Sequence, residues 1–197
     1  RIREIKDKNT KRIVASEVLY DLPEWFGMPE STKSYIDDSS DMPYLAAYTD
    51  DKLVGLIVLN HTSDHTADIF VMGVKKVFHN KGIGRSLNNA YESLARNLGY
   101  TYSQVKTVQT GHYKEYDISN KFYLAMGYVE LECFYDLWDK DNPCQVYIKY
   151  LGWNFKGSEL VEKIVIRKAV KEDAKDILDY CKVVGGQTNN LSIGKEG

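Results

Sequence analysis

The chain has 197 residues, of which 43% are hydrophobic and 27% are charged, and its net charge of -2 at pH 7 gives no indication of a nucleic-acid partner. Its length allows one full domain and part of another; no apolar run approaches the ~20 residues of a membrane span. The first residues, RIREIKDKNTK, lack the apolar core of a signal peptide, so we expect a cytoplasmic protein. The cysteines at 133, 144 and 181 lack the spacing of metal ligands, so we expect them to be reduced and the protein to hold no metal.

The first part of the sequence predicts a strand, two helices and three consecutive antiparallel strands. A strand is expected at residues 2–5, followed by a helix that Asn9 or Thr10 caps and that ends near Tyr20. A loop at 22–29 separates it from a short helix that would be capped at 31 or 32. Strands at 44–48, 53–60 and 67–74, with polar turns between them, then form hairpins.

A loop with two glycines follows the third of these strands and opens a helix. It ends in Gly82-Ile83-Gly84, after which apolar residues at helical spacing continue to Leu98 before Gly99. The free N–H groups and the dipole at such a helix start suit a phosphate. Lys81 and Arg85 beside the glycines would add positive charge. Taken alone, the pattern also describes an ordinary tight turn before a helix.

The rest of the sequence predicts a second strand–helix unit, a hairpin and a separate tail. We expect a strand at 103–109, a short helix from Asp117 to 125 or 126 that stops at Gly127, and strands at 129–137 and 145–151. A strand at 163–169 and a helix at 170–184 repeat the strand–helix start of the chain. The predicted organisation is a domain at 1–151, a linker at 152–163 and a partial second unit at 164–197.

Two motifs resemble those of the GNAT (GCN5-related) N-acetyltransferases. His79-x-x-Gly82-x-Gly84 resembles motif A, Gln/Arg-x-x-Gly-x-Gly/Ala, with His79 at the place of the usual Gln or Arg. Residues 120–128, NKFYLAMGY, resemble motif B, in which a helix carries a tyrosine and ends at Gly-Phe or Gly-Tyr. The resemblance covers residues 1–151 and implies an α/β (α+β mixed) fold, with a central mixed, mostly antiparallel sheet flanked by helices. Residues 164–174 resemble the start of a second such domain.

The resemblance implies acetyl transfer from acetyl-CoA, as co-substrate, to a primary amine by direct attack in a ternary complex, with no metal. The strand at 72–74 would separate from its neighbour and pair with the pantetheine arm, and an N–H near Met72 or Gly73 would polarise the thioester carbonyl. The implied cofactor-binding residues are Met72, Gly73, Val74, His79, Asn80, Lys81, Gly82, Ile83, Gly84, Arg85, Asn120 and Tyr123.

Tyr123 and Asp68 are the predicted catalytic residues. A phenol with a pKa near ~10 is protonated at neutral pH, so Tyr123 can give a proton to the departing thiolate. Asp68 lies fourteen residues before Gly82, at the position of the glutamate base in the histone-acetylating members. It could equally serve as an ion-pair partner for a lysine or arginine; Glu24, His112 and Glu115 are further candidates for the base.

Acidic and aromatic residues in the loops point to a cationic acceptor. The loop set Glu24, Glu30, Asp37, Asp38 and Asp41 would attract a small amine such as an aminoglycoside or a polyamine, which would make the protein an antibiotic-resistance enzyme or a polyamine acetyltransferase. A protein or peptide amine, and a non-catalytic acyl-CoA sensor, are the alternatives, and a homodimer is possible. The predicted substrate-binding residues are Glu24, Trp25, Phe26, His112, Glu115, Tyr135, Asp136 and Trp138.

Overall fold

A computed structural model describes residues 1–152 and 170–179 of the chain, which divides into two units, Arg1–Lys156 and Gly157–Gly197. The elements of the first unit are β1 (Ile2–Glu4), α1 (Lys8–Leu19), α2 (Pro29–Asp38), η1 (Ser39–Asp41), β2 (Tyr44–Thr49), β3 (Lys52–Ser63), β4 (Thr66–Val74), η2 (Lys76–Phe78), α3 (Ile83–Leu98), β5 (Tyr102–Val108), α4 (Lys114–Ala125), β6 (Val129–Asp139) and β7 (Asn142–Tyr150). None of the described helices has both the length and the apolar character needed to cross a membrane.

In the second unit, the described part consists of η3 (Lys171–Asp173) and helical residues 174–179. This agrees with the start of the helix predicted at 170–184. The predicted strand at 163–169, most of the predicted linker and the end of that helix lie outside the described residues. The division into a domain, a linker and a partial second unit therefore stays a prediction.

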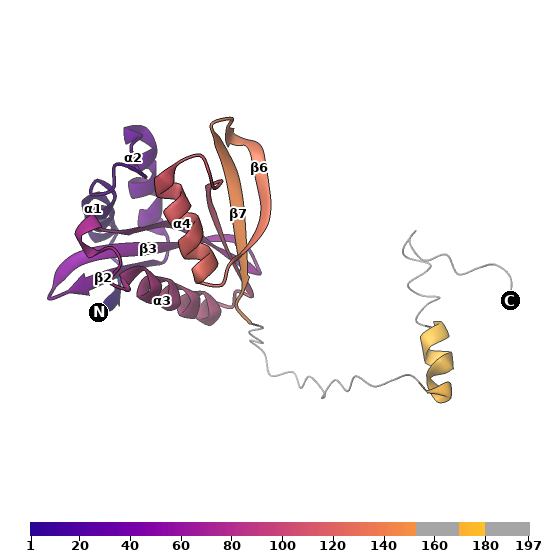
Figure 1. Cartoon of the computed structure of the whole chain (residues 1–197). Helices are drawn as coiled ribbons and strands as arrows, with labels where there is room; N and C mark the ends of the chain where they lie inside the picture. The colour runs from indigo at the N-terminus through magenta and orange to yellow at the C-terminus, as the bar shows by residue number, and fades with distance from the viewer. Residues whose placement is uncertain (153–169, 180–197) are drawn as a thin grey trace. The chain divides into compact units, whose positions relative to one another are not determined.

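The seven strands of the first unit form one sheet in the order β1-β2-β3-β4-β5-β7-β6 (Figure 1). Only β4 and β5 pair in parallel, and every other neighbouring pair is antiparallel. This confirms the predicted mixed, mostly antiparallel sheet, including the three consecutive antiparallel strands that lead to the glycine loop.

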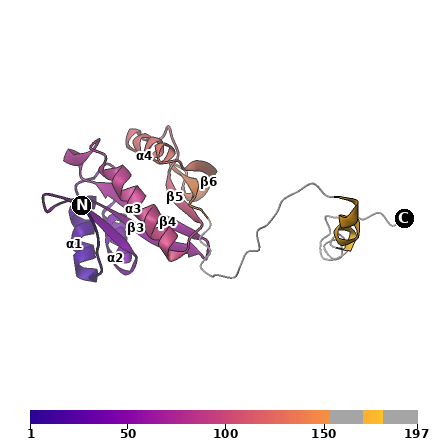
Figure 2. The ribbon, with the colours of Figure 1, turned by 90° about the horizontal axis from the view of Figure 1, so that it is seen from below.

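Helices cover both faces of the sheet: α1 and α2 lie on one side, and α3 and α4 lie on the other (Figure 2). Each side has its own buried core. Val18, Leu19 and Ile36 pack on the α1–α2 side, whereas Leu87, Tyr91 and Tyr123 pack on the α3–α4 side. The sheet therefore separates two layers, and a residue of β4 faces one layer or the other.

A β-bulge at Phe70 determines which layer each residue of β4 faces. Val71 pairs with Val58 and Ile69 pairs with Leu59, so Phe70 is one extra residue on β4. Consequently Ile69 packs in the α3–α4 core although Val71, two residues later, packs in the α1–α2 core. Without the extra residue, strand alternation would put both side chains on one face.

Three helices begin earlier than the sequence predicted. The cap of α1 is Asp7, whose carboxylate accepts from the Thr10 backbone N–H at 2.7 Å, and not Asn9 or Thr10. In α2, Pro29 occupies the first turn, where its missing N–H needs no partner, so the caps predicted at 31 or 32 are wrong. Likewise α4 follows Tyr113, and Asp117 lies within the helix, where its carboxylate accepts from the Gly111 N–H at 2.8 Å.

Candidate active site

β4 and β5 pair at one end and then separate. Their parallel pairing runs from Thr66 opposite Tyr102 to Ile69 opposite Val105, and the rest of β5 pairs with β7 alone. Among the described strands, residues 71–74 of β4 therefore have a partner on the β3 side only. A strand edge of this kind offers backbone N–H and C=O groups to an extended ligand. The separation expected at 72–74 is present.

The glycine loop connects this open edge to the start of α3. Gly82 is the N-cap residue of α3, with φ of 77°, and no side chain caps the helix. A Cβ built on Gly82 would meet no atom within 4 Å, and Asn80 also has a positive φ, of 58°. Lys81 and Arg85 are exposed beside it. The first turn of α3 thus presents uncapped N–H groups and two cations to solvent, which suits an anion.

Gly84 of the motif and Gly73 of β4 serve packing. A Cβ on Gly84 would lie 3.2 Å from Cε2 of Phe122, so this glycine lets α3 and α4 approach each other. A Cβ on Gly73 would lie 3.0 Å from side-chain atoms of both Val18 and Leu22. Gly73 therefore faces α1, and its small size allows that helix to pack closely on β4; close approach of a ligand was the role expected from the sequence.

His79 links the end of β4 to the loop between α1 and α2. Its Nε2 lies 2.6 Å from the carbonyl oxygen of Val74, and its ring contacts the Trp25 ring edge-on, with 5.9 Å between the centroids. The side chain at the variant position of the motif thus holds the glycine loop in place.

Trp25 in turn joins the α1–α2 loop to α4. Its Nε1 donates to the carbonyl of Glu115 and to the Ser119 hydroxyl, both at 3.1 Å, and Tyr116 donates from its hydroxyl to the carbonyl of Trp25 at 3.0 Å. The structure therefore brings together two predicted substrate-binding residues, Trp25 and Glu115, with Glu115 contributing through its backbone. Ser119 and Tyr116 were not identified from the sequence.

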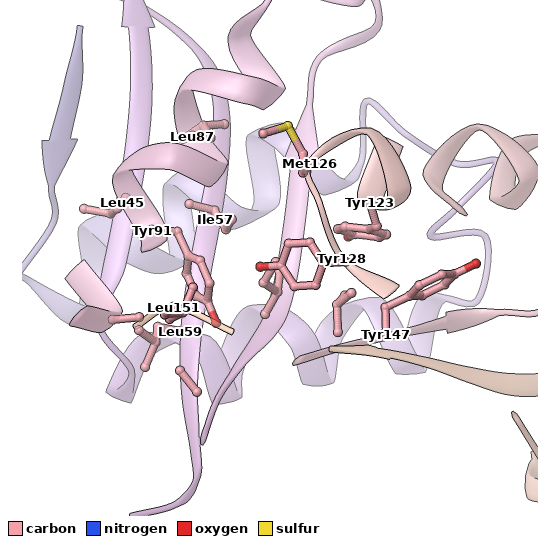
Figure 3. Packing of buried hydrophobic residues seen from close by; sticks show 14 of the residues in the cluster. Leu45, Ile57, Leu59, Leu87, Tyr91, Tyr123, Met126, Tyr128, Tyr147 and Leu151 are labelled. Carbon is pink, nitrogen blue, oxygen red and sulfur yellow. The ribbon is translucent and has the colours of Figure 1, made fainter. Parts of the chain in front are cut away.

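Tyr123 is buried on α4 within an aromatic cluster (Figure 3). Its ring centroid is 5.4 Å from that of Phe122, 5.9 Å from that of Tyr128 and 6.4 Å from that of Tyr147. Burial, with a smaller contribution from the charge of Asp68, raises the pKa of Tyr123. Within residues 1–152 and 170–179, its hydroxyl has no hydrogen-bond partner. The phenol thus keeps its proton, and that proton is not shared with another protein group.

Asn120, one helical turn before Tyr123, connects α4 to two strands. Its side chain is 1% exposed, and its Nδ2 donates to the carbonyls of Val108 and Tyr116 at 2.9 and 2.7 Å. Its Oδ1 accepts from the Tyr147 hydroxyl at 2.7 Å. These bonds tie α4 to the separated end of β5 and to β7. The direct cofactor contact expected of Asn120 stays a prediction.

Asp68 lies in the paired part of β4 on the α1–α2 side and is 6% exposed. Its Oδ1 accepts from Lys106 Nζ at 3.1 Å, so the ion pair that the sequence left open is present. Burial raises the pKa of Asp68, while the charge of Lys106 and hydrogen bonds from Lys106 and Gln104 oppose the rise. Its role as the base stays a prediction. Lys106 was not identified as a site residue from the sequence. The order polar, apolar, polar at residues 104–106 is nevertheless typical of a strand with one polar and one apolar face.

The acidic loop residues are largely engaged by cations. Glu24 pairs with Lys76, Asp37 with Arg12 and Asp41 with Lys8. Three of the five carboxylates expected to attract a cation are thus compensated by neighbouring side chains. The electrostatic attraction predicted from the loop composition is correspondingly weaker than the sequence suggests.

The remaining predicted acceptor residues do not share the hydrogen bonds of Trp25. Phe26 packs edge-on against Tyr35 of α2, at 5.8 Å between ring centroids, and His112 is exposed before α4. Tyr135, Asp136 and Trp138 lie on the outer half of the edge strand β6, exposed to solvent. In the described part of the chain, no hydrogen bond, ion pair or ring contact joins Tyr135 or Trp138 to Trp25. Nor do the described residues contain a group of three or more His, Cys, Asp or Glu side chains placed to hold a metal.

Comparison with known proteins agrees with this geometry. The family model of the acetyltransferase (GNAT) family matches residues 14–128. A search of curated proteins finds no match. Among solved structures, a GNAT-family protein from Desulfovibrio desulfuricans is 15% identical with a TM-score of 0.67, and it covers 77% of this chain and 99% of its own.

Two further solved structures carry a named activity. An aminoglycoside 6'-N-acetyltransferase complexed with coenzyme A is 18% identical with a TM-score of 0.63, covering 77% of this chain and 97% of its own. The ribosomal-protein-S18-alanine N-acetyltransferase of Escherichia coli is 13% identical with a TM-score of 0.62, covering 81% of this chain and 99% of its own. At these identities the likeness concerns the fold.

Proposed function

Because the chain belongs to the GNAT acetyltransferase family, and so is an N-acetyltransferase, we propose that it moves an acetyl group from acetyl-CoA to a primary amine of a small cationic molecule, such as an aminoglycoside or a polyamine. The observation that carries the donor assignment is the open edge of β4, which is followed, after η2 and the glycine loop, by the uncapped start of α3. One element suits an extended arm and the other suits a pyrophosphate, in the order in which they occur in coenzyme A.

In this proposal the chain holds the donor mainly through its backbone. The N–H groups of the first turn of α3 bind the pyrophosphate, with Lys81 and Arg85 adding charge. The unpaired edge at 72–74 aligns the pantetheine arm, and an N–H near Met72 or Gly73 polarises the thioester carbonyl. His79 supports the loop through its contact with the Val74 carbonyl.

Two side chains handle the protons of the transfer. Asp68 accepts a proton from the incoming ammonium, directly or through a water, so that the amine nitrogen can attack the carbonyl carbon. As the C–N bond forms and the C–S bond breaks, Tyr123 gives its proton to the departing thiolate, and the second proton lost by the amine nitrogen restores the Tyr123 hydroxyl. A phenol whose pKa is raised by burial is fully protonated for this step.

Support for a small cationic acceptor comes from the groups on the α1–α2 side of the separating strands. Asp68 is a buried carboxylate there, and Tyr35 of the same layer is near enough to feel its charge: burial and, to a smaller extent, the charge of Asp68 raise the pKa of the Tyr35 hydroxyl. A structural neighbour acts on an aminoglycoside, and another acts on a protein amine, so the fold is compatible with both acceptor classes. We propose the small-molecule acceptor because Asp68 is a buried carboxylate that already pairs with a compact cation, the Lys106 ammonium at 3.1 Å.

The deciding experiment measures thiol release from acetyl-CoA with a panel of amines. Aminoglycosides, polyamines and peptides with free N-termini are compared at equal concentration, and direct binding of acetyl-CoA is measured in parallel. Release that depends on an aminoglycoside or polyamine supports the proposal. Release only with peptides would replace it with a protein acetyltransferase, and binding without any release would indicate an acyl-CoA sensor.

A further inference from the structure

A primary amine of the protein itself lies where the two strands separate. Lys106 is the first residue of β5 beyond the last pair, Ile69 opposite Val105. Its Nζ is 3.1 Å from Asp68, and its side chain is 32% exposed, so the amine remains accessible. In the proposed function this is the end of the open edge, where the acetyl group must lie for any amine to reach it. Lys106 thus has the two partners that an acceptor amine needs, namely a carboxylate that can take its proton and the acetyl group of the donor.

A second lysine provides a matched comparison on the other side of the sheet. Lys149 of β7 also pairs with a buried carboxylate, with Nζ 2.6 Å from Glu92 Oε1 and a side-chain exposure of 20%. It additionally donates to the Met126 carbonyl at 2.6 Å. In the sheet register Lys149 lies opposite Ser103, within the joined part of the strands. Its chemical setting is therefore similar to that of Lys106, but its place is not the point of separation.

We propose that the enzyme acetylates its own Lys106 when acetyl-CoA is bound and no acceptor amine is present. The proposal rests on the proposed function, which supplies the acetyl donor. Asp68 takes a proton from the Lys106 ammonium, and the freed nitrogen forms a bond with the thioester carbonyl carbon. The C–S bond breaks, the thiolate takes the proton of Tyr123, and the second proton lost by the nitrogen restores the Tyr123 hydroxyl. The products are an Nε-acetyl-lysine, free coenzyme A and a protonated Asp68, which releases its proton to solvent.

The intramolecular position makes this reaction distinguishable from chemical acetylation in solution. A reacting group held in place has an effective concentration far above that of free reagents. Lys106 should therefore be acetylated roughly a hundredfold or more faster than Lys149 or fully exposed lysines. Because each molecule modifies itself, the rate constant should not depend on the protein concentration.

The test incubates the protein with acetyl-CoA alone and follows each lysine by peptide mass spectrometry, starting from a sample whose modification state is measured at time zero. The variants are Lys106→Arg, which keeps the charge beside Asp68, and Lys149→Arg as the matched control. We expect rapid acetylation at 106 in the parent and in Lys149→Arg. In Tyr123→Phe, acetylation at 106 should slow while that of exposed lysines is unchanged.

Two results would overturn the inference in different ways. If acetyl-CoA binds and an amine of the panel is acetylated while Lys106 reacts no faster than Lys149, self-acetylation is refuted and the proposed function stands. If acetyl-CoA does not bind at all, the proposed function fails and the self-acetylation fails with it. A rate at Lys106 that rises in proportion to protein concentration would also refute modification within one molecule.

Discussion

Replacing Tyr123 by phenylalanine tests the chemistry with little disturbance of the fold. The substitution removes one hydroxyl, and that hydroxyl has no hydrogen-bond partner in the described part of the chain, so no protein group is left unsatisfied. The ring keeps its contacts with Phe122, Tyr128 and Tyr147. We therefore expect the free energy of unfolding to change by less than about 0.5 kcal/mol.

The effect on turnover should be much larger. A positioned general acid contributes about 10²-fold or more to the rate, which corresponds to about 2.7 kcal/mol in the activation barrier. The kcat of Tyr123→Phe should fall by about this factor, whereas the affinity for acetyl-CoA should stay within about threefold, because the pyrophosphate and the arm are held by backbone groups elsewhere.

Tyr147→Phe is the matched control, because its ring lies in the same cluster but its hydroxyl has a partner. Loss of that hydroxyl leaves the Asn120 Oδ1 without its 2.7 Å donor, which should cost about 1–3 kcal/mol of stability. At about 2–4 °C for each kcal/mol, the melting temperature should drop measurably.

Steady-state kinetics with the acceptor found in the amine panel, isothermal titration with acetyl-CoA and thermal unfolding give the three quantities. The reasoning is refuted if Tyr123→Phe keeps the parental kcat, or if its stability falls as far as that of Tyr147→Phe. In the first case Tyr123 is a packing residue, and in the second its hydroxyl has a structural partner.

Three further predictions concern the loop, the base and the tryptophan. Gly82→Ala and Gly99→Ala should each cost roughly 1–2 kcal/mol of stability, because both positions have φ in the left-handed region. Only Gly82→Ala should also weaken acetyl-CoA binding in titration calorimetry, and equal affinities of the two variants would contradict the anion site. Because burial raises the pKa of Asp68, kcat/KM should fall as the pH drops through a value above the ~3.9 of an ordinary aspartate, and a pH profile of Asp68→Asn that retains this limb would reject Asp68 as the base. Trp25→Phe loses two hydrogen bonds to α4 and should speed amide exchange at residues 115–119, whereas Trp138→Phe on β6 should leave that exchange unchanged; identical exchange maps would contradict the proposed link.

The elements around the glycine loop could be predicted because their signals are local. An apolar run gives β4, and the spacing from Ile83 to Leu98 gives α3, which ends at Gly99 as expected. Helix starts were less accurate, because several polar residues near each start can serve as the cap. Asp117 is an example: its carboxylate closes a loop with the Gly111 N–H instead of capping the helix.

The parts of the site that could not be predicted from the sequence depend on contacts between residues far apart in the chain. Lys106 reaches Asp68 across 38 positions of sequence, through a parallel pairing that no local pattern specifies. The acidic loop illustrates the opposite error, because its carboxylates looked uncompensated in sequence. Lys8 and Arg12 project from α1 to Asp41 and Asp37, and helix packing alone decides that they meet.

The extra residue of β4 makes this strand unusually intolerant of changes in length. Deleting Phe70 would restore simple alternation of side chains along β4. If Met72 and Gly73 kept their present faces of the sheet, Asp68 and Ile69 would each turn to the opposite face. The carboxylate of Asp68 and the β4 groups proposed for thioester binding would then exchange sides relative to each other. A residue added or removed at the Asp50–Asp51 turn has no such effect. In the evolution of this domain, insertions should therefore accumulate in the hairpin turns, and this bulge should persist even where its side chain changes.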